Sequence, residues 1–172
     1  MILIPKGGGG YRSIGLVEAI WKVCTSIVNS RLQSSIVIHD VLHGFRQGRG
    51  TGTAIMEEKL EQQIAGIVHE LLFQVFIDVR NSYDSLDRGM CMEIVRGYGL
   101  GYKIQRLLQH YWDGQRLVPK SGKYYGRPFR TGRGVTQGGP VSPAIFNIVV
   151  DSVVRTALQE VCEPQEAQHG FG

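Results

Sequence analysis

The sequence has few cysteines and no long apolar run. Its three cysteines, Cys24, Cys91 and Cys162, form no Cys-x-x-Cys pair and have no matching histidine spacing, so neither a disulfide framework nor a zinc site is indicated. No apolar run approaches the roughly 20 residues that a membrane-spanning helix needs, and Met1 to Ile4 is too short for the apolar part of a secretory signal. We therefore expect an intracellular protein, cytoplasmic or nuclear, that is neither secreted nor in a membrane.

Acidic residues are also absent from a long stretch of the chain. The 172 residues carry a formal charge of +4, and no Asp or Glu lies between Asp113 and Asp151. That stretch instead contains aromatic side chains and a run of basic ones, Arg116, Lys120, Lys123, Arg127, Arg130 and Arg133. Basic and aromatic groups together suit a nucleic-acid backbone and its bases. A solvated basic hairpin explains the same composition equally well.

Hydrophobic periodicity predicts one α/β unit, which fits the length and the apolar fraction of 42%. We expect strands at 1–4 and 11–14, a strand pair within 115–133, and helices at about 16–32, 53–70, 89–96, 102–111 and 145–161. Two helices have apolar stripes expected to face the core, namely Leu16, Ile20, Val23 and Ile27 on one and Ile55, Leu60, Ile64 and Ile67 on the other. The last helix is apolar nearly all round, and Ser142 is expected to cap it.

Residues 71–79 form a nearly continuous apolar run with one charge near its end, Asp78. Such a run is typical of a strand covered on both faces of a sheet. A carboxylate at the end of a buried strand is a common ligand for Mg²⁺, a hard cation that prefers carboxylates and substrate phosphates. By itself the pattern fits a helix cap or half of a salt bridge better.

The residues around Asp78 carry a recognisable pattern. In segment 76–87, Phe-Ile-Asp-Val-Arg-Asn-Ser-Tyr-Asp-Ser-Leu-Asp, the aromatic Tyr83 stands five positions after Asp78. This segment resembles the first palm motif of reverse transcriptases. The resemblance implies that Asp78 is a catalytic residue that binds Mg²⁺ or Mn²⁺ and that the Tyr83 ring excludes a sugar 2′-hydroxyl. The structural alternatives are a core aromatic for Tyr83 and, preferred for Asp84, a helix cap.

A second, more specific block is the glycine-rich segment 134–147, Gly-Val-Thr-Gln-Gly-Gly-Pro-Val-Ser-Pro-Ala-Ile-Phe-Asn. It is similar to the family's Gly-Val-x-Gln-Gly-x-Pro-x-Ser-Pro loop, which leads into a long helix. Its glycines allow the backbone to approach a base pair closely. The resemblance implies that Gln137 and Gly138 form a platform where template and nucleotide meet. Thr136 and Gly139 stand at positions where many relatives carry a basic residue and a cysteine, respectively.

Two further blocks lie upstream in the family's order. Segment 4–16 resembles the fingers hairpin, which implies that Lys6 and Arg12 contact the nucleotide triphosphate, although Ser13 replaces the usual proline. Segment 43–51, His-Gly-Phe-Arg-Gln-Gly-Arg-Gly-Thr, resembles the next block. Its basic residues, Arg46 and Arg49, are expected to contact the template backbone. The hairpin residues Lys120, Lys123, Arg127, Arg130 and Arg133 are expected to do the same.

The resemblance as a whole implies an α/β (α+β) fingers-palm fold from an RNA-directed DNA polymerase, with RNA template, DNA primer and dNTP as partners. Residues 1–70 correspond to the fingers and 71–172 to a partial palm with a basic hairpin insertion. The family's Tyr-x-Asp-Asp hairpin and thumb are missing, because after Asn147 the acids are only Asp151, Glu160, Glu163 and Glu166. We therefore expect a truncated domain that does not polymerise by itself.

Other readings remain open at this point. One is a catalytically silent nucleic-acid-binding remnant, or a subunit completed by a second chain. Another is an unrelated Mg²⁺-dependent nucleotidyl enzyme, which requires a second carboxylate near Asp78. A dinucleotide fold is excluded because the paired glycines lack a third glycine, and a P-loop is excluded because Lys6 precedes its glycines.

Overall fold

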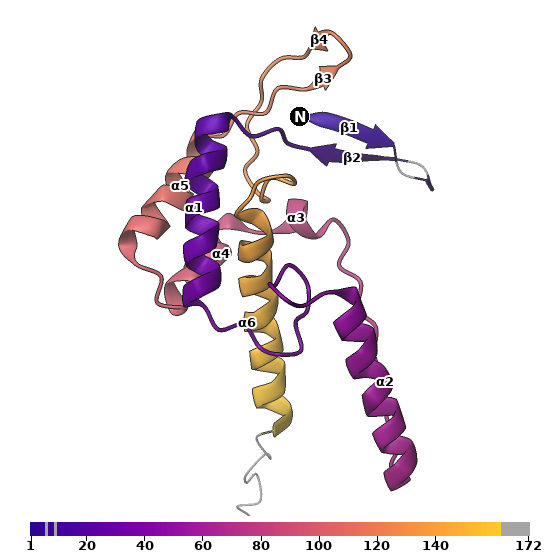
Figure 1. The fold of residues 1–172 in the computed structure, drawn as a ribbon. Coiled ribbons are helices and arrows are strands. Elements are labelled where there is room, and N and C mark those ends of the chain that lie inside the picture. The colour runs from indigo at the N-terminus through magenta and orange to yellow at the C-terminus, as the bar shows by residue number, and fades with distance from the viewer. Residues whose placement is uncertain (6, 9, 163–172) are drawn as a thin grey trace, which may run out of the picture.

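The computed structural model describes residues 1–5, 7–8 and 10–162, which form a small sheet and a set of helices (Figure 1). In chain order the elements are β1 (Ile2–Pro5), β2 (Tyr11–Ile14), α1 (Ala19–Ser35), α2 (Thr51–Val68), α3 (Ser82–Ser85), α4 (Arg88–Gly97), α5 (Tyr102–Gly114), β3 (Lys120–Ser121), β4 (Tyr124–Tyr125) and α6 (Ser142–Cys162). The predicted mixture of α and β structure is confirmed. Each helix predicted from periodicity is present, with its ends shifted by a few residues.

The sheet joins two hairpins that are far apart in the sequence. Its strand order is β2-β1-β3-β4. Strands β1 and β2 are antiparallel, with Leu3 opposite Ser13, whereas β1 and β3 meet in parallel at Ile2 and Lys120. The β3–β4 hairpin is antiparallel and confirms the strand pair predicted within 115–133. The sheet lies at one end of the helical body (Figure 1).

The hydrophobic core lies between α1, α4, α5 and α6. Deeply buried apolar side chains on these helices are Leu32, Cys91, Val95, Leu108, Trp112, Ile145 and Ile148. Burying a large aliphatic side chain contributes roughly 1.5–3 kcal/mol, so these residues supply much of the stability. Burial also raises the pKa of the Cys91 thiol to about 11, which makes it an unreactive core residue at neutral pH.

The predicted inward faces of α1 and α2 are wrong. The predicted stripe of Leu16, which precedes α1, and of Ile20, Val23 and Ile27 on α1 is exposed. Thr25, Val28 and Leu32 face the core instead. Thr25 fits there because its hydroxyl donates to the Trp21 carbonyl at 2.6 Å within the same helix. Helix α2 has no buried residue, so its predicted stripe of Ile55, Leu60, Ile64 and Ile67 is also exposed. In Figure 1 this helix projects away from the other helices.

The predicted strand at 71–79 does not form, and its residues are exposed and irregular. A strand requires a neighbour for its backbone hydrogen bonds, and no part of the chain that the structure describes pairs with this segment. The segment runs back along α2, and Gln62 Nε2 donates to Gln74 Oε1 at 3.2 Å. Asp84 does not cap a helix either: it lies inside α3, and Asp87 caps α4 by accepting from the Met90 amide at 2.9 Å.

Helix α6 runs through the middle of the molecule (Figure 1). Its first half is buried as predicted, but further along Val153 and Leu158 are exposed, so the prediction of burial all round is wrong there. Ser142 begins the helix, and its hydroxyl donates to the Thr136 carbonyl at 2.7 Å. The hydroxyl therefore fastens the preceding glycine-rich loop. None of the helices described is both long enough and apolar enough to cross a membrane.

Candidate functional site

The glycine-rich loop before α6 is hydrogen-bonded directly to the segment that contains Tyr83. The Val135 amide donates to the Tyr83 carbonyl at 2.9 Å, and the Gly134 amide donates to the Leu86 carbonyl at 2.7 Å. Gly134 has a φ of 81°, and a Cβ there would lie 2.9 Å from the backbone of Asp84. Only glycine allows this close, left-handed approach. Two segments about fifty residues apart in the sequence are thus joined through their backbones.

The same loop also contacts the end of β2. The Gly15 amide donates to the Gln137 carbonyl at 2.7 Å. Gly138 has a φ of 102°, and a Cβ on it would lie 2.7 Å from the Gly15 carbonyl oxygen. The backbone conformation and the contact both require glycine at this position. The loop is therefore held between the first hairpin and the Tyr83 segment.

The first turns of α6 contact two of the four sequence blocks. The Phe146 ring stacks on the Tyr83 ring with a centroid distance of 5.3 Å. Asn147 donates from Nδ2 to the Gly44 carbonyl at 2.7 Å, which fastens the 43–51 segment to the helix. Together with the hydrogen bond between Gly15 and Gln137, these two contacts bring all four blocks to the start of α6. This convergence was expected only from the resemblance, since the blocks are spread over most of the chain.

One guanidinium anchors the segment that precedes the glycine-rich loop. Arg88, at the start of α4, donates from Nε to the Gly134 carbonyl and from Nη1 to the Thr131 carbonyl, both at 2.8 Å. It also donates to the Trp112 carbonyl and to the side chains of Thr131 and Gln115. Burial lowers the pKa of Arg88, but the group remains charged at any physiological pH. Arg88 therefore holds this segment through several charge-assisted hydrogen bonds.

The β3–β4 hairpin presents its basic and aromatic side chains to solvent. Residues 121–130 are all exposed, and the hairpin turns at Gly122, whose φ is 58°. Lys120 lies over the Tyr125 ring with its Nζ 5.3 Å from the centroid, and Lys123 lies over Tyr124 at 5.5 Å. Within the described part of the chain, the basic residues Arg127, Arg130 and Arg133 form no ion pair. The hairpin is thus an exposed cationic surface with accessible rings.

The sequence matches the family model described as reverse transcriptase (RNA-dependent DNA polymerase) over residues 4–169. The chain belongs to this family. The expectation drawn from the four sequence blocks is thereby confirmed. The four blocks that meet at the start of α6 are those by which the sequence resembles reverse transcriptases.

Curated relatives come from retrotransposable elements. The chain is 26% identical to the retrovirus-related Pol polyprotein from type-2 retrotransposable element R2DM of Drosophila melanogaster, over 88% of this chain and 14% of that protein. It is 30% identical to the corresponding polyprotein from type-1 retrotransposable element R2 of Nasonia vitripennis, over 90% of this chain and 16% of that protein. A reverse transcriptase-like protein of Chlamydomonas reinhardtii is 29% identical over 88% of this chain. The chain thus spans less than a fifth of the first two relatives.

Asp78, the predicted metal ligand, belongs to no cluster of possible metal ligands among the described residues. Asp78 is exposed and lies in the irregular segment before α3. Among the residues described, no three Asp, Glu, His or Cys side chains come together in a way that would hold a metal ion. A small cavity beside the glycine-rich loop is lined by Asp84, Arg88 and Gln137, and Asp78 does not line it. The described residues therefore do not form a Mg²⁺ site by themselves.

The later acid nearest to the core, Asp151, has a structural role. Its carboxylate is fully buried and accepts from the His39 amide at 2.6 Å, from the Tyr98 hydroxyl at 2.5 Å and from Arg155 Nε at 2.7 Å. Burial by itself would raise the pKa of this carboxyl, but these hydrogen bonds hold the pKa below its usual range. Burial and the Asp151 contact raise the pKa of Tyr98 to about 12. Both carboxylate oxygens of Asp151 therefore accept hydrogen bonds that hold the core together.

The predicted nucleotide contacts occupy different environments. Arg12 is exposed on β2, opposite Ile4, whereas Lys6 lies outside the described residues. Tyr83 is half-buried against Phe146, and burial raises the pKa of its hydroxyl, which agrees with a packing role for the ring. Gln137 is half-buried and lines the small cavity.

The two arginines of the 43–51 segment bond within the chain. Arg46 Nη1 donates to the His39 carbonyl at 2.9 Å and to the Leu42 carbonyl at 2.8 Å. Arg49 Nη2 pairs with the Asp40 carboxylate at 2.6 Å. Both side chains help to fold the loop, which sequence reasoning did not anticipate.

Sequence reasoning also missed the residues that hold the site together, chiefly Arg88, Gln115 and Asn147. Gln115 donates to the Thr136 hydroxyl and accepts from Arg88, so it links two parts of the loop region. The signal for Arg88 in the sequence was weak, because an arginine directly after the helix-capping Asp87 looks like any charged residue exposed to solvent. Its partners are mostly backbone carbonyls, which a sequence does not distinguish.

Proposed function

We propose that this chain forms the fingers (about 1–70) and the leading part of the palm (about 71–172) of a retroelement RNA-directed DNA polymerase. In the intact enzyme it would help to copy an RNA template onto a DNA primer from dNTPs. The observation that carries the proposal is the convergence of four family blocks at the start of α6. Separately, any one of these blocks has an ordinary structural explanation.

The proposed roles follow the blocks. Arg12 and Lys6 would contact the triphosphate, and the Tyr83 ring would fill the space beside the sugar 2′ position. Gln137 and Gly138 would carry the nascent base pair. Close backbone packing supports the platform role, because the Gly138 backbone fits against Gly15 with no room for a side chain. Such packing limits the movement of the loop and preorganises a surface for binding.

The metal chemistry of the proposed enzyme would need ligands beyond those described here. Two-metal phosphoryl transfer uses ions roughly 3.5–4 Å apart, which several converging carboxylates must hold. Asp78 is the proposed ligand from this chain. The remaining carboxylates would come from another part of a longer protein or from a second chain.

The exposed hairpin at β3–β4 would contact the nucleic-acid backbone. Its basic residues are Lys120, Lys123, Arg127, Arg130 and Arg133. Each phosphate that a protein neutralises releases counterions, so the affinity should fall steeply with salt and should be insensitive to sequence. Arg46 and Arg49 would contribute less, because bonds within the loop already hold their guanidiniums.

Two measurements test the proposal. Fluorescence anisotropy with single-stranded RNA at rising salt should give weak binding and a steep negative salt dependence; no binding at low salt would contradict the nucleic-acid role. In a version of the chain extended with a relative's downstream sequence, Tyr83→Ala should admit ribonucleotides that the parent rejects, and Tyr102→Ala, at an exposed residue of α5 outside the four blocks, serves as the matched control. Unchanged discrimination would remove Tyr83 from the proposed role.

A second candidate is a catalytically silent nucleic-acid-binding subunit. It is favoured by the absence of a three-acid cluster among the described residues. Primer extension by the purified chain with Mg²⁺ or Mn²⁺ distinguishes the two. We expect no extension, since a single carboxylate does not hold two ions in register. Extension that Asp78→Ala abolishes would show that a second copy or other acids complete the site.

A further inference from the structure

Residues 136–139 form a tight turn that carries the proposed Gln137–Gly138 platform. The Gly139 amide donates to the Thr136 carbonyl at 3.0 Å and closes the turn. Gly138 occupies the third position with a φ of 102°, where this kind of turn favours glycine. The platform is thus the corner of one turn, and a group that contacts this turn is in a position to fix the platform.

The Tyr111 hydroxyl lies directly beside this turn. Tyr111 is near the end of α5, its side chain is only 6% exposed, and its ring packs against Trp21 at a centroid distance of 5.4 Å. A Cβ built on Gly139 would lie 3.5 Å from the hydroxyl oxygen. Because Gly139 has no side chain, the hydroxyl can approach the turn closely.

The same hydroxyl has no hydrogen-bond partner among the described residues. An unpaired polar group in the interior lowers the stability of a folded protein, and most buried hydroxyls are therefore paired. Tyr98 is the contrasting case, since its hydroxyl donates to the Asp151 carboxylate at 2.5 Å. The Tyr111 hydroxyl is thus a spare donor placed beneath the platform turn.

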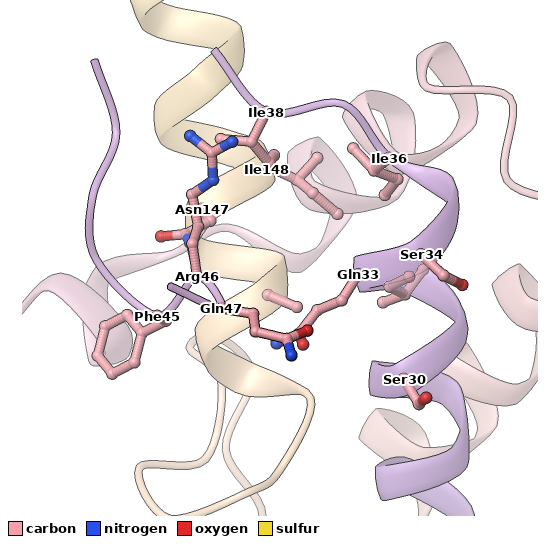
Figure 2. Close-up of a pocket in the computed structure, with 12 residues that line it drawn as sticks. Ser30, Gln33, Ser34, Ile36, Ile38, Phe45, Arg46, Gln47, Asn147 and Ile148 are labelled. Carbon is pink, nitrogen blue, oxygen red and sulfur yellow. The ribbon is translucent and has the colours of Figure 1, made fainter. Parts of the chain in front are cut away.

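Unpaired polar groups elsewhere in the chain have a simpler explanation. Gln33 and Gln47 extend toward each other across a cavity of about 360 Å³ between α1, the segment 36–47 and α6 (Figure 2). Both of these side chains are exposed, so water can bond to their amides. The Tyr111 oxygen is buried, and a protein group is the nearer candidate for its partner.

That candidate is the hydroxyl of Thr136. Its oxygen accepts from Gln115 Nε2, and Gln115 Oε1 in turn accepts from Arg88 at 3.0 Å. A hydroxyl oxygen has two lone pairs, so the Thr136 oxygen can accept a second hydrogen bond. Burial raises the pKa of Tyr111, and the Thr136 hydroxyl acts in the opposite direction because it lies close by. A small movement of the turn would join the spare donor to the spare acceptor.

We propose that Tyr111 is a positioning residue of the platform: when the primer end of a template–primer duplex occupies Gln137 and Gly138, the Tyr111 hydroxyl donates to the Thr136 hydroxyl and fixes the turn. This inference rests on the proposed platform role of Gln137 and Gly138. It adds a residue from α5, which lies outside the four sequence blocks. The bond forms only in the occupied state, so the hydroxyl contributes to binding and not to the stability of the free chain.

Two labelled ligands test the proposal with the chain as it exists, namely an RNA template annealed to a shorter DNA primer and the same RNA as a single strand. Tyr111→Phe should weaken binding of the duplex about fivefold in anisotropy titrations and leave binding of the single strand unchanged. Its melting temperature should stay the same or rise, because the variant removes an unpaired buried group. Tyr98→Phe is the matched control: it should lower the melting temperature, because Asp151 loses a donor, and bind both ligands as the parent does.

Hydrogen exchange supplies a readout that a purely structural role would not change. In the parent, the duplex should slow exchange of the amides of residues 134–139, and in Tyr111→Phe this protection should be largely lost. The double variant Tyr111→Phe/Thr136→Val should bind the duplex no more weakly than Thr136→Val alone, because the two hydroxyls act as one pair.

The outcomes separate this inference from the function on which it rests. If the duplex protects residues 134–139 equally in the parent and in Tyr111→Phe, the positioning role is wrong and the platform role stands. If the duplex does not protect these residues in the parent, the platform role fails and the inference falls with it. A melting temperature lowered in Tyr111→Phe as much as in Tyr98→Phe would overturn the inference, since the hydroxyl would then be bonded in the free chain. Additive losses in the double variant would also overturn it, because Tyr111 would then act through a group other than Thr136.

Discussion

The start of α6 and the segment 71–79 are both rich in aliphatic residues, yet they have opposite environments. Ile145 is fully buried among α1, α4 and α5, whereas Ile77 is 85% exposed in an irregular segment beside α2. The difference lies in their partners. Helix α6 satisfies its backbone internally and needs only side-chain neighbours, but a strand needs another strand for its hydrogen bonds. An apolar run therefore indicates a tendency to be buried. Whether it is buried depends on the packing and hydrogen-bonding partners that the rest of the fold provides.

The largest expected effect comes from one substitution made in both regions. Ile145→Ala should lower the free energy of unfolding by about 2–5 kcal/mol, because it leaves a cavity in a packed core. Ile77→Ala should change it by less than about 0.5 kcal/mol, because the side chain is already in water. Urea denaturation measures both. Similar losses at the two positions would show that segment 71–79 is covered in solution, and gel filtration would then reveal whether a second copy covers it.

A smaller effect is expected at the arginine that fastens the glycine-rich loop region. Arg88→Met should cost on the order of 3 kcal/mol, since it removes charge-assisted bonds to two loop carbonyls and leaves them short of a donor. The control is Arg96→Met on the same helix, where the exposed arginine pairs with exposed Glu93 and the cost should stay below about 0.5 kcal/mol. Thermal melting of both variants provides the measurement. Equal shifts would mean that the Arg88 network adds no stability.

Sequence reasoning predicted helix α6 and the loop before it better than it predicted the faces of α1. The helix start at Ser142 and the apolar turns that follow are local features, and the structure has both. On α1 two stripes compete, and the buried one contains Thr25, which looks polar in the sequence. The chain buries it because its hydroxyl bonds to the Trp21 carbonyl. Which stripe faces inward depends on α6, far away in the sequence.

The candidate site, too, was predictable from the sequence only in part. The four blocks were recognisable because each is short and contiguous, and they do meet at α6. The residues that fasten them, such as Arg88 and Asn147, act on backbone carbonyls of other blocks. Those contacts depend on the fold and leave no spacing pattern. The strand predicted at 71–79 is wrong for the same reason, since no described part of the chain pairs with this segment.

The buried carboxylate of α6 should make stability depend on pH. The pKa of Asp151 is lowered in the folded state. The contribution of this carboxylate to the free energy of unfolding is therefore present above its unfolded pKa of roughly 4 and is lost as the pH falls through its folded pKa. Asp151→Asn should cost about 2 kcal/mol at neutral pH and weaken the acid dependence. Glu160→Gln, on an exposed part of the same helix, is the control.

The raised pKa of Tyr98 should make stability fall again between roughly pH 10 and 12. Urea midpoints across the pH range test both limbs, and a parent curve that runs parallel to that of Asp151→Asn down to low pH would contradict the first.

The smallest expected effect concerns single charges on the two exposed regions. Lys123→Gln on the β3–β4 hairpin should weaken binding of single-stranded RNA only a few-fold and reduce the magnitude of the logarithmic salt slope by about 0.7, the contribution of one phosphate contact on a single strand. Lys59→Gln removes the same charge from exposed helix α2 and should leave the slope unchanged, since α2 lies apart from the hairpin. Both variants keep the fold, because neither side chain is buried. Anisotropy titrations at several salt concentrations give the slopes directly. Equal changes in slope would mean that the strand responds to the overall charge of the chain, and the hairpin would lose its assignment as the nucleic-acid surface.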